Sequence, residues 1–122
     1  MMIPFLVSKI HQATVTSTNL EYMGSISIDE EIMDSAGLRE NQKVDVYDIT
    51  NGNRLTTYVI QAPRGSKVIE LNGAAARLIN PGDRVIIAAY ALIDERELDS
   101  RNAVILLMEA DNRISRVVHS RI

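Results

Sequence analysis

The dipeptide Gly24-Ser25 opens a short run of alternating serine and isoleucine, and its two residues could react with each other. A serine hydroxyl can attack the carbonyl carbon of the preceding residue and convert the peptide bond into an ester. β-Elimination then cuts the chain and leaves dehydroalanine, which hydrolyses to an N-terminal pyruvoyl group. Glycine before the serine favours the attack because it has no Cβ and tolerates a strained backbone. Gly-Ser pairs are also common in turns, so the dipeptide alone favours a turn.

The composition of the 122-residue chain limits the other kinds of chemistry. The chain has no cysteine, which excludes disulfides, thiol nucleophiles and cysteine metal ligands. Its two histidines lie far apart in the sequence, so we expect no metal site. The formal net charge of −3 argues against a nucleic-acid-binding surface. No stretch approaches the roughly 18 apolar residues of a transmembrane helix, and the apolar start is too short for a signal peptide. We therefore expect a cytoplasmic protein without a membrane segment.

Alternation of polar and apolar residues predicts a single domain over residues 1–122, made mainly of short strands. The expected strands cover residues 8–16, 25–28, 43–50, 54–61, 67–71, 84–93, 103–109 and 114–118. Asp29 is expected to cap a short helix that ends at Gly37, and a single helical turn is expected over residues 74–79. Asn51-Gly52 predicts a hairpin between two of the strands. Short strands with one or two small helices favour a closed β-barrel over an open sheet.

Four stretches, in their order and spacing, together resemble the aspartate 1-decarboxylase family. They are residues 8–16, Tyr22 with Gly24-Ser25, "DITNGNRLTTYVI" at 48–60 and "RGSKVIELNGAAA" at 64–76. No single stretch is diagnostic, but the set is specific. The resemblance implies a mainly β fold, a double-psi β-barrel, assembled as a homotetramer with active sites at subunit interfaces. It also implies self-cleavage into chains 1–24 and 25–122, with Ser25 becoming a pyruvoyl group.

The implied reaction turns L-aspartate into β-alanine and CO2, and supplies β-alanine for pantothenate and coenzyme A synthesis. Removal of the α-carboxyl group leaves a carbanion, which needs an electron sink. In the family a pyruvoyl ketone forms a Schiff base with the substrate amine and takes up these electrons. The chain has no recognisable site for pyridoxal phosphate, and the family needs no metal.

The resemblance implies a role for several residues of the strand at 54–61 and its surroundings. Arg54 would clamp a substrate carboxylate, which suits a planar bidentate donor, and Lys9 could assist a second carboxylate. Tyr58 would return a proton to the decarboxylated intermediate. Thr57 would hydrogen-bond the carbonyl that Ser25 attacks. Each has a plainer interpretation, namely an exposed arginine, a solvated lysine, a core tyrosine and a strand threonine.

An ideal strand places Thr57 on the face opposite to Arg54 and Tyr58. Residues of one site would then point to two sides of the sheet. Either a β-bulge or a subunit interface could bring them together.

Further residues would complete the site. Asn72 would donate a hydrogen bond near the pyruvoyl group, and small residues after it would bind substrate through their backbone: Gly73, Ala74 and Ala75. The wall of the site would be formed by His11, Tyr22 and Tyr47. His11 could equally be a satisfied strand histidine, and Tyr47 stands where members of the family often carry tryptophan.

Two other interpretations remain open. Small barrels also serve as DNA-binding or adaptor modules, although the acidic balance weighs against DNA. The chain could also be an inactive precursor whose Gly24-Ser25 bond stays uncut. Glutamate differs from aspartate by one methylene, a difference typically worth only about 1–3 kcal/mol, so the charges of Arg54 and Lys9 do not decide the substrate.

Overall fold

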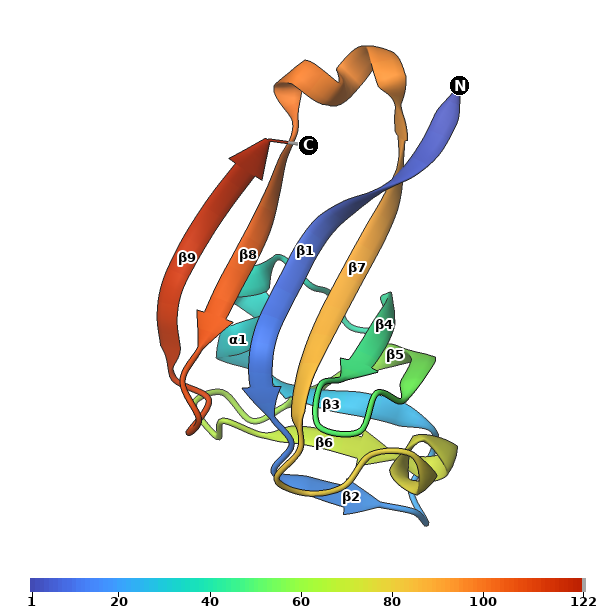
Figure 1. Ribbon diagram of the computed structural model, residues 1–122, viewed down its shortest axis with the longest axis vertical. Helices are drawn as coiled ribbons and strands as arrows, with labels where there is room; N and C mark the ends of the chain where they lie inside the picture. Colours follow the sequence, from blue (N-terminus) through green and yellow to red (C-terminus); the bar gives the residue numbers. More distant parts are fainter. Residues whose placement is uncertain (122) are drawn as a thin grey trace.

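Strands dominate the computed structural model, which describes residues 1–121 (Figure 1). In chain order the elements are β1 (Met2–Thr14), β2 (Ser17–Asn19), β3 (Ser25–Asp29), α1 (Glu30–Ala36), β4 (Lys43–Asp48), β5 (Arg54–Ala62), β6 (Ile69–Asn72), η1 (Gly73–Arg77), β7 (Arg84–Asp94), η2 (Glu95–Ser100), β8 (Asn102–Met108) and β9 (Ile114–Arg121). The two η elements are short 3₁₀ helices. Every strand expected from the sequence is present, with ends that differ by a few residues.

The nine strands form one sheet in the order β2-β6-β3-β5-β4-β7-β1-β8-β9. Three of the neighbouring pairs are parallel, β1 with β8, β2 with β6 and β3 with β5. The sheet bends around a core, and the fold is mainly β, of the double-psi β-barrel type, as the sequence predicted. The closed ladder expected from the sequence is not found over residues 1–121, because β2 and β9 remain at the two ends of the sheet. The long strands β1, β7, β8 and β9 extend away from the small strands toward η2 (Figure 1).

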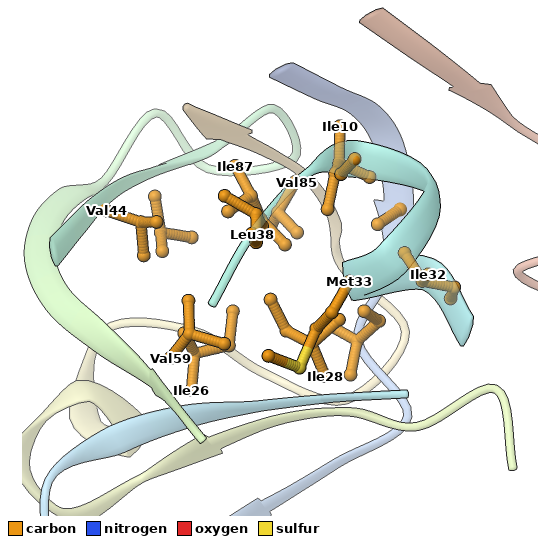
Figure 2. Packing of buried hydrophobic residues seen from close by; sticks show 14 of the residues in the cluster. Ile10, Ile26, Ile28, Ile32, Met33, Leu38, Val44, Val59, Val85 and Ile87 are labelled. Carbon is orange, nitrogen blue, oxygen red and sulfur yellow. The ribbon is translucent and has the colours of Figure 1, made fainter. Parts of the chain in front are cut away.

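The core lies between helix α1 and the strands β1, β3, β4, β5 and β7 (Figure 2). Its largest side chains are fully buried, and each contributes roughly 1.5–3 kcal/mol by leaving water. Those labelled in Figure 2 are Ile10, Ile26, Ile28, Ile32, Met33, Leu38, Val44, Val59, Val85 and Ile87. Ile26 and Ile28 alternate with serines along β3, so packing of the isoleucines fixes which way the serines point.

The helix after β3 begins and ends as the sequence predicted. Asp29 caps it by accepting a hydrogen bond from the N–H of Glu31, and Gly37 ends it in the left-handed conformation at φ 71°. Asp29 also accepts hydrogen bonds from the backbone N–H groups of Gly65 and Lys67. Burial alone would raise the pKa of Asp29, but these three N–H groups outweigh it and lower the pKa. The end of β3 is therefore fixed to the turn before β6.

The predicted hairpin joins β4 to β5, but its turn differs from the one expected. Gly52 has a positive φ of 80°, whereas Asn51 does not, so the loop is not a two-residue turn with both central residues left-handed. A hydrogen bond from the N–H of Gly52 to the C=O of Asp48 closes a longer loop instead. The side chains of Asn51 and Asn53 both donate to the C=O of Leu78, at 3.0 and 2.8 Å. The loop is thereby attached to the segment after η1.

Asp48 and Asp83 form a buried pair of carboxyl groups beside this loop. Oδ1 of Asp48 accepts hydrogen bonds from the N–H groups of Thr50 and Asn51, whereas its Oδ2 has no partner within residues 1–121 unless a carboxyl proton is present. Burial, a hydrogen bond to Asp83 and the charge of that carboxylate together raise the pKa of Asp48 to about 6. Asp48 therefore keeps its proton at mildly acidic pH.

We expect Asp48→Asn to stabilise the protein at neutral pH. The folded state keeps the Asp48 proton to a higher pH than the unfolded state does, so wild-type stability falls as the pH rises from about 4 to about 6. Asparagine retains Oδ1 for the two N–H groups and offers Asp83 a permanent donor. The gain at pH 7.5 should be on the order of 2 kcal/mol, measured by thermal unfolding at fixed protein concentration. The slope between pH 4 and 6 should also flatten, whereas the exposed control Asp99→Asn should retain it; an unchanged slope in Asp48→Asn would contradict the pairing.

Candidate active site

Ser25 lies at the start of β3 and is fully buried. On one side it is paired with Asn72, the last residue of β6. On the other side the next residue, Ile26, is paired with Val59 of β5, and this parallel register brings Ser25 alongside Tyr58. Ser25 thus enters the sheet between two strands, whereas Gly24 lies in the exposed bend that precedes β3.

The side chain of Asn72 holds the hydroxyl of Ser25. Nδ2 of Asn72 donates to Oγ of Ser25 and to Oγ of Ser27, both at 3.0 Å, and Ser25 donates its own proton to the C=O of Met23 at 2.9 Å. Ser25 and Asn72 are both 0% exposed. Oδ1 of Asn72 is also buried, and no group in the described part of the chain hydrogen-bonds it. A buried amide with an unpaired oxygen is costly in a finished core, and is more common at functional sites.

A second Gly-Ser dipeptide in the chain has different surroundings. Gly65 and Ser66 lie in an exposed turn, where Oγ of Ser66 accepts one long hydrogen bond, of 3.4 Å, from the N–H of Val68. The two dipeptides therefore differ at the serine: Ser66 is exposed, whereas Ser25 is buried and its hydroxyl accepts a hydrogen bond from a side chain.

Gly73 brings its backbone against Gly24. It has a positive φ of 66°, and a Cβ at this position would lie 2.7 Å from Cα and 2.8 Å from N of Gly24, and 3.1 Å from the C=O of Tyr22. Gly24 itself is not left-handed, and a Cβ there would meet the C=O of Asn72 at an ordinary 3.9 Å. The strained glycine expected from the sequence at Gly24 is therefore found at Gly73, because close approach of two backbones requires it there.

A hollow of about 360 Å³ adjoins the dipeptide. Gly24 and Asn72 form part of its wall, and β5 and η1 supply four further predicted residues: Thr57, Tyr58, Ala74 and Ala75. This volume is at the lower end of the range for small-molecule sites. Six of the predicted site residues thus surround one space next to the Gly24-Ser25 bond.

The remaining predicted polar residues lie on a second surface, which we call the cationic face: Lys9, His11, Tyr47 and Arg54. Tyr47 is paired with Arg54 on β5 and with Ile86 on β7, and Ile86 is paired with His11 on β1. Lys9 is two residues before His11 on the same side of β1. The guanidinium of Arg54 lies 4.2 Å from the centre of the Tyr47 ring, a cation–π contact. None of these four side chains lines the hollow beside Ser25 in the described chain.

Comparison with known proteins gives these two groups of residues a context. The sequence matches the family described as aspartate decarboxylase over residues 1–115. The chain belongs to the aspartate decarboxylase family. It is 51% identical to the aspartate 1-decarboxylase of Acetivibrio thermocellus over 93% of this chain and 90% of that protein. It is 54% identical to that of Caldicellulosiruptor saccharolyticus, over 93% and 89%, and 50% identical to that of Wolinella succinogenes, over 98% of both. The resemblance inferred from the sequence, and with it the interpretation as an enzyme, is confirmed.

The electrostatics of the cationic face favour an anion. Burial lowers the pKa of His11, as do the charges of Lys9 and Arg84, and its buried Nδ1 has no hydrogen-bond partner among residues 1–121. A hydrogen bond to Tyr90, with an O–O distance of 3.1 Å, and burial raise the pKa of Tyr47 to about 12. Tyr47 therefore stays protonated near neutral pH. In this aspartate decarboxylase the face combines cations with neutral aromatic rings.

The structure also shows where two further predicted site residues lie, Thr57 and Tyr22. β5 is paired with β4 and with β3 in continuous register, so the β-bulge considered for Thr57 is not found, and Thr57 and Arg54 lie on opposite faces. Tyr22 contributes its backbone next to Gly73, while its side chain is 50% exposed. The described chain therefore does not bring Arg54 to the hollow that Thr57 lines.

Two residues near the site were not predicted. Ser27 shares the Asn72 amide with Ser25, and the alternation Ser25-Ile26-Ser27 was the signal that could have revealed it. Tyr90 hydrogen-bonds Tyr47 across two strands, and no local pattern in the sequence indicates that contact.

Among residues 1–121, no cluster of three or more histidine, aspartate or glutamate side chains could hold a metal ion. No helix within residues 1–121 is both long enough and apolar enough to cross a membrane.

Proposed function

We propose that the chain is a pyruvoyl-dependent L-aspartate α-decarboxylase that cuts itself between Gly24 and Ser25. One observation carries the proposal: the Ser25 hydroxyl is fully buried and accepts a hydrogen bond from Asn72, and both Asn72 and Gly24 line a hollow. The relatives that share about half of the sequence bear the name aspartate 1-decarboxylase. The single domain would then consist of a small chain, 1–24, and a large chain, 25–122.

Self-cleavage would use atoms that are already in the chain. Oγ of Ser25 bonds to the carbonyl carbon of Gly24, the C–N bond between the two residues breaks, and the freed amine takes the hydroxyl proton. Elimination then removes the Cα proton of Ser25 to water and breaks the Cβ–Oγ bond, so Gly24 leaves as a carboxylate. Addition of one water to the resulting dehydroalanine releases ammonia and leaves the pyruvoyl group. Thr57 lines the hollow with Gly24 and would hydrogen-bond the carbonyl under attack.

The residues around Ser25 fit a pyruvoyl group. Once the hydroxyl has gone, Nδ2 of Asn72 has a hydrogen free for the new carbonyl, and its unpaired Oδ1 can accept from the substrate amine. Gly73 packs its backbone against Gly24, where a side chain would not fit. A pyruvoyl group supplies an electron sink for the pair released with CO2. No metal and no pyridoxal phosphate take part in the proposed reaction.

Binding of aspartate would require both surfaces. Arg54 and Lys9 offer cations for the two substrate carboxylates, and Tyr58, which lines the hollow, would return the proton. Gly73, Ala74 and Ala75 would bind substrate through their backbone N–H groups. Because Arg54 and Lys9 do not line the hollow of their own chain, a neighbouring copy would supply them.

A homotetramer with active sites at its subunit interfaces would supply Arg54 and Lys9 from a neighbouring copy. Next to the buried Ser25, the side chains of Leu20, Tyr22 and Met23 are 43%, 50% and 73% exposed. Contiguous exposed apolar residues are typical of a contact surface. A neighbouring copy that covers them would also bring its cationic face, with His11 and Tyr47 as wall residues, toward the hollow. We place the enzyme in the cytoplasm, where its β-alanine would enter pantothenate and coenzyme A synthesis.

Intact-mass spectrometry of the purified protein tests this proposal. We expect two chains cut after Gly24, with the large chain lighter by one ammonia than a fragment that begins with serine. Release of CO2 from aspartate, compared with release of CO2 from glutamate, then tests the substrate. A chain that remains whole after prolonged warm incubation, without aspartate turnover, would contradict the proposal.

We expect Arg54→Gln to raise the KM for aspartate while self-cleavage proceeds normally. The variant loses a charge-assisted hydrogen bond worth roughly 1.5–3 kcal/mol, so kcat/KM should fall about 10- to 150-fold. Steady-state kinetics on fully cleaved protein measures it, with the exposed Arg116→Gln as the matched control. Equal kinetics in the two variants would exclude Arg54 from substrate binding.

A further inference from the structure

We propose that Ser27 is a positioning residue for self-cleavage, which holds the Asn72 amide so that its Nδ2 donates to Oγ of Ser25. The inference rests on the proposed function and adds to it a residue whose action is indirect. Ser27 touches neither the bond that breaks nor the hollow beside it.

The three side chains form a small buried network. β3 alternates its side chains, so Ser25 and Ser27 point to the same side, and pairing with β6 places Asn72 opposite Ser25. Each serine oxygen lies 3.0 Å from Nδ2 of Asn72, and Ser27 is 8% exposed. A primary amide carries two N–H donors. The two serines therefore use both of them.

The hydrogen bonds to the two serines determine the orientation of the Asn72 side-chain amide. Ser25 gives its own proton to the C=O of Met23, so it can act toward Asn72 only as an acceptor. If the amide turned by 180°, Oδ1 would face an acceptor at Ser25, and the two N–H groups of Asn72 would lose both serines. With both serines present, the observed orientation makes two hydrogen bonds and the turned one at most one, from the hydroxyl of Ser27. Leaving a buried donor unpaired costs about 1–3 kcal/mol.

Without the Ser27 oxygen the amide has one anchor instead of two. The observed orientation would then keep only the hydrogen bond to Oγ of Ser25 and leave one buried N–H unpaired. A single hydrogen bond does not fix the plane of an amide, which can rotate about its Cβ–Cγ bond. The Asn72 donor would therefore be aimed at Oγ of Ser25 less firmly.

That donor matters most in the elimination step. The former Oγ of Ser25 is then the bridging oxygen of the ester, and it takes the electron pair of the Cβ–Oγ bond as it becomes a carboxylate oxygen of Gly24. A donor already aimed at this atom stabilises the charge that develops on it. The preceding step forms the ester and needs no donor on Oγ. Loss of Ser27 should therefore slow the second step more than the first, and the ester should accumulate.

Ser27→Ala, studied in freshly purified full-length protein, tests the inference. Brief treatment with hydroxylamine at neutral pH cleaves an ester, and releases residues 1–24 as a hydroxamate and a large chain that still begins with serine. Fragments cut at the two Asn-Gly bonds of the chain, after Asn51 and Asn72, have different masses and are counted separately. We expect pyruvoyl formation, followed by intact mass, to slow about tenfold or more, with a larger hydroxylamine-cleavable fraction than in wild type. Ser27→Thr retains a hydroxyl and should restore both values toward wild type.

Each outcome bears on the positioning role of Ser27 or on the proposed function. A pyruvoyl rate within twofold of wild type in Ser27→Ala, or a slower rate without more trapped ester, overturns the positioning role. If Ser27→Ala does not fold, Ser27→Cys, which keeps the shape but offers a weak acceptor, must show the same accumulation of ester for the inference to stand. Failure of the wild type itself to form a pyruvoyl group would overturn the proposed function, and is read from a different sample.

Discussion

Ser25→Ala should give a folded protein of one uncut chain with no measurable aspartate turnover. The variant lacks the oxygen that attacks the Gly24 carbonyl, so neither the ester nor the pyruvoyl group can form. The loss should be complete, because no other side chain can supply the ketone. Intact mass and β-alanine formation measure it. The missing hydroxyl leaves one N–H of the buried Asn72 unpaired, so unfolding should become easier by about 1–3 kcal/mol.

The chain provides a matched control for this variant. Ser66→Ala removes the serine of the other Gly-Ser dipeptide, in an exposed turn, and should be cut after Gly24 as the wild type is. Cleavage after Gly24 in the Ser25→Ala variant would show that a different nucleophile acts. Cleavage after Gly65 in the wild type would show that the buried setting of Ser25 is not what selects the bond.

The sequence predicted most strands and the helix, because these follow from local patterns. It did not indicate that β1 begins at Met2 or that β2 exists. A proline at position 4 argues against a central strand, but β8 pairs with β1 only at residues 8–11, so Pro4 lies where that side of β1 has no neighbouring strand in the described chain. β2 has three residues, too few to show a period. Both errors arise where the partner strand, not the strand's own sequence, decides the structure.

The residues of the site were predicted better than their arrangement. Spacing along the chain cannot tell that Thr57 and Tyr58 share a hollow with Gly24 while Arg54, on the same strand, contacts Tyr47 on another surface. That division depends on which strands neighbour β5, and these are distant in sequence. A prediction from the sequence also names site residues without saying which copy of the chain would supply each of them.

Gly73→Ala should slow self-cleavage strongly and destabilise the fold. The added Cβ would lie 2.7 Å from Cα and 2.8 Å from N of Gly24, and these are backbone atoms that cannot rotate away. Either Gly24 shifts, which moves its carbonyl relative to Ser25, or η1 shifts, which moves Asn72. The left-handed φ of 66° adds about 1–2 kcal/mol for any residue with a Cβ. We expect cleavage to slow at least about 100-fold. This corresponds to a rise of roughly 3 kcal/mol in the activation free energy, because the reaction depends on the position of the Gly24 carbonyl relative to Ser25.

Gly52→Ala separates the two causes in Gly73→Ala. Gly52 has a similar φ of 80°, but a Cβ there would meet no atom of the described chain within 4 Å. This control should therefore lose about 1–2 kcal/mol of stability and still cleave at the wild-type rate. Intact mass against time gives the cleavage rates, and thermal unfolding gives the stabilities. If Gly73→Ala cleaved as fast as Gly52→Ala, contact between Gly73 and Gly24 would not be what holds the scissile bond in place. A slow Gly73→Ala beside a fast Gly52→Ala would assign the defect to that contact, because the strain of a left-handed backbone is common to both variants.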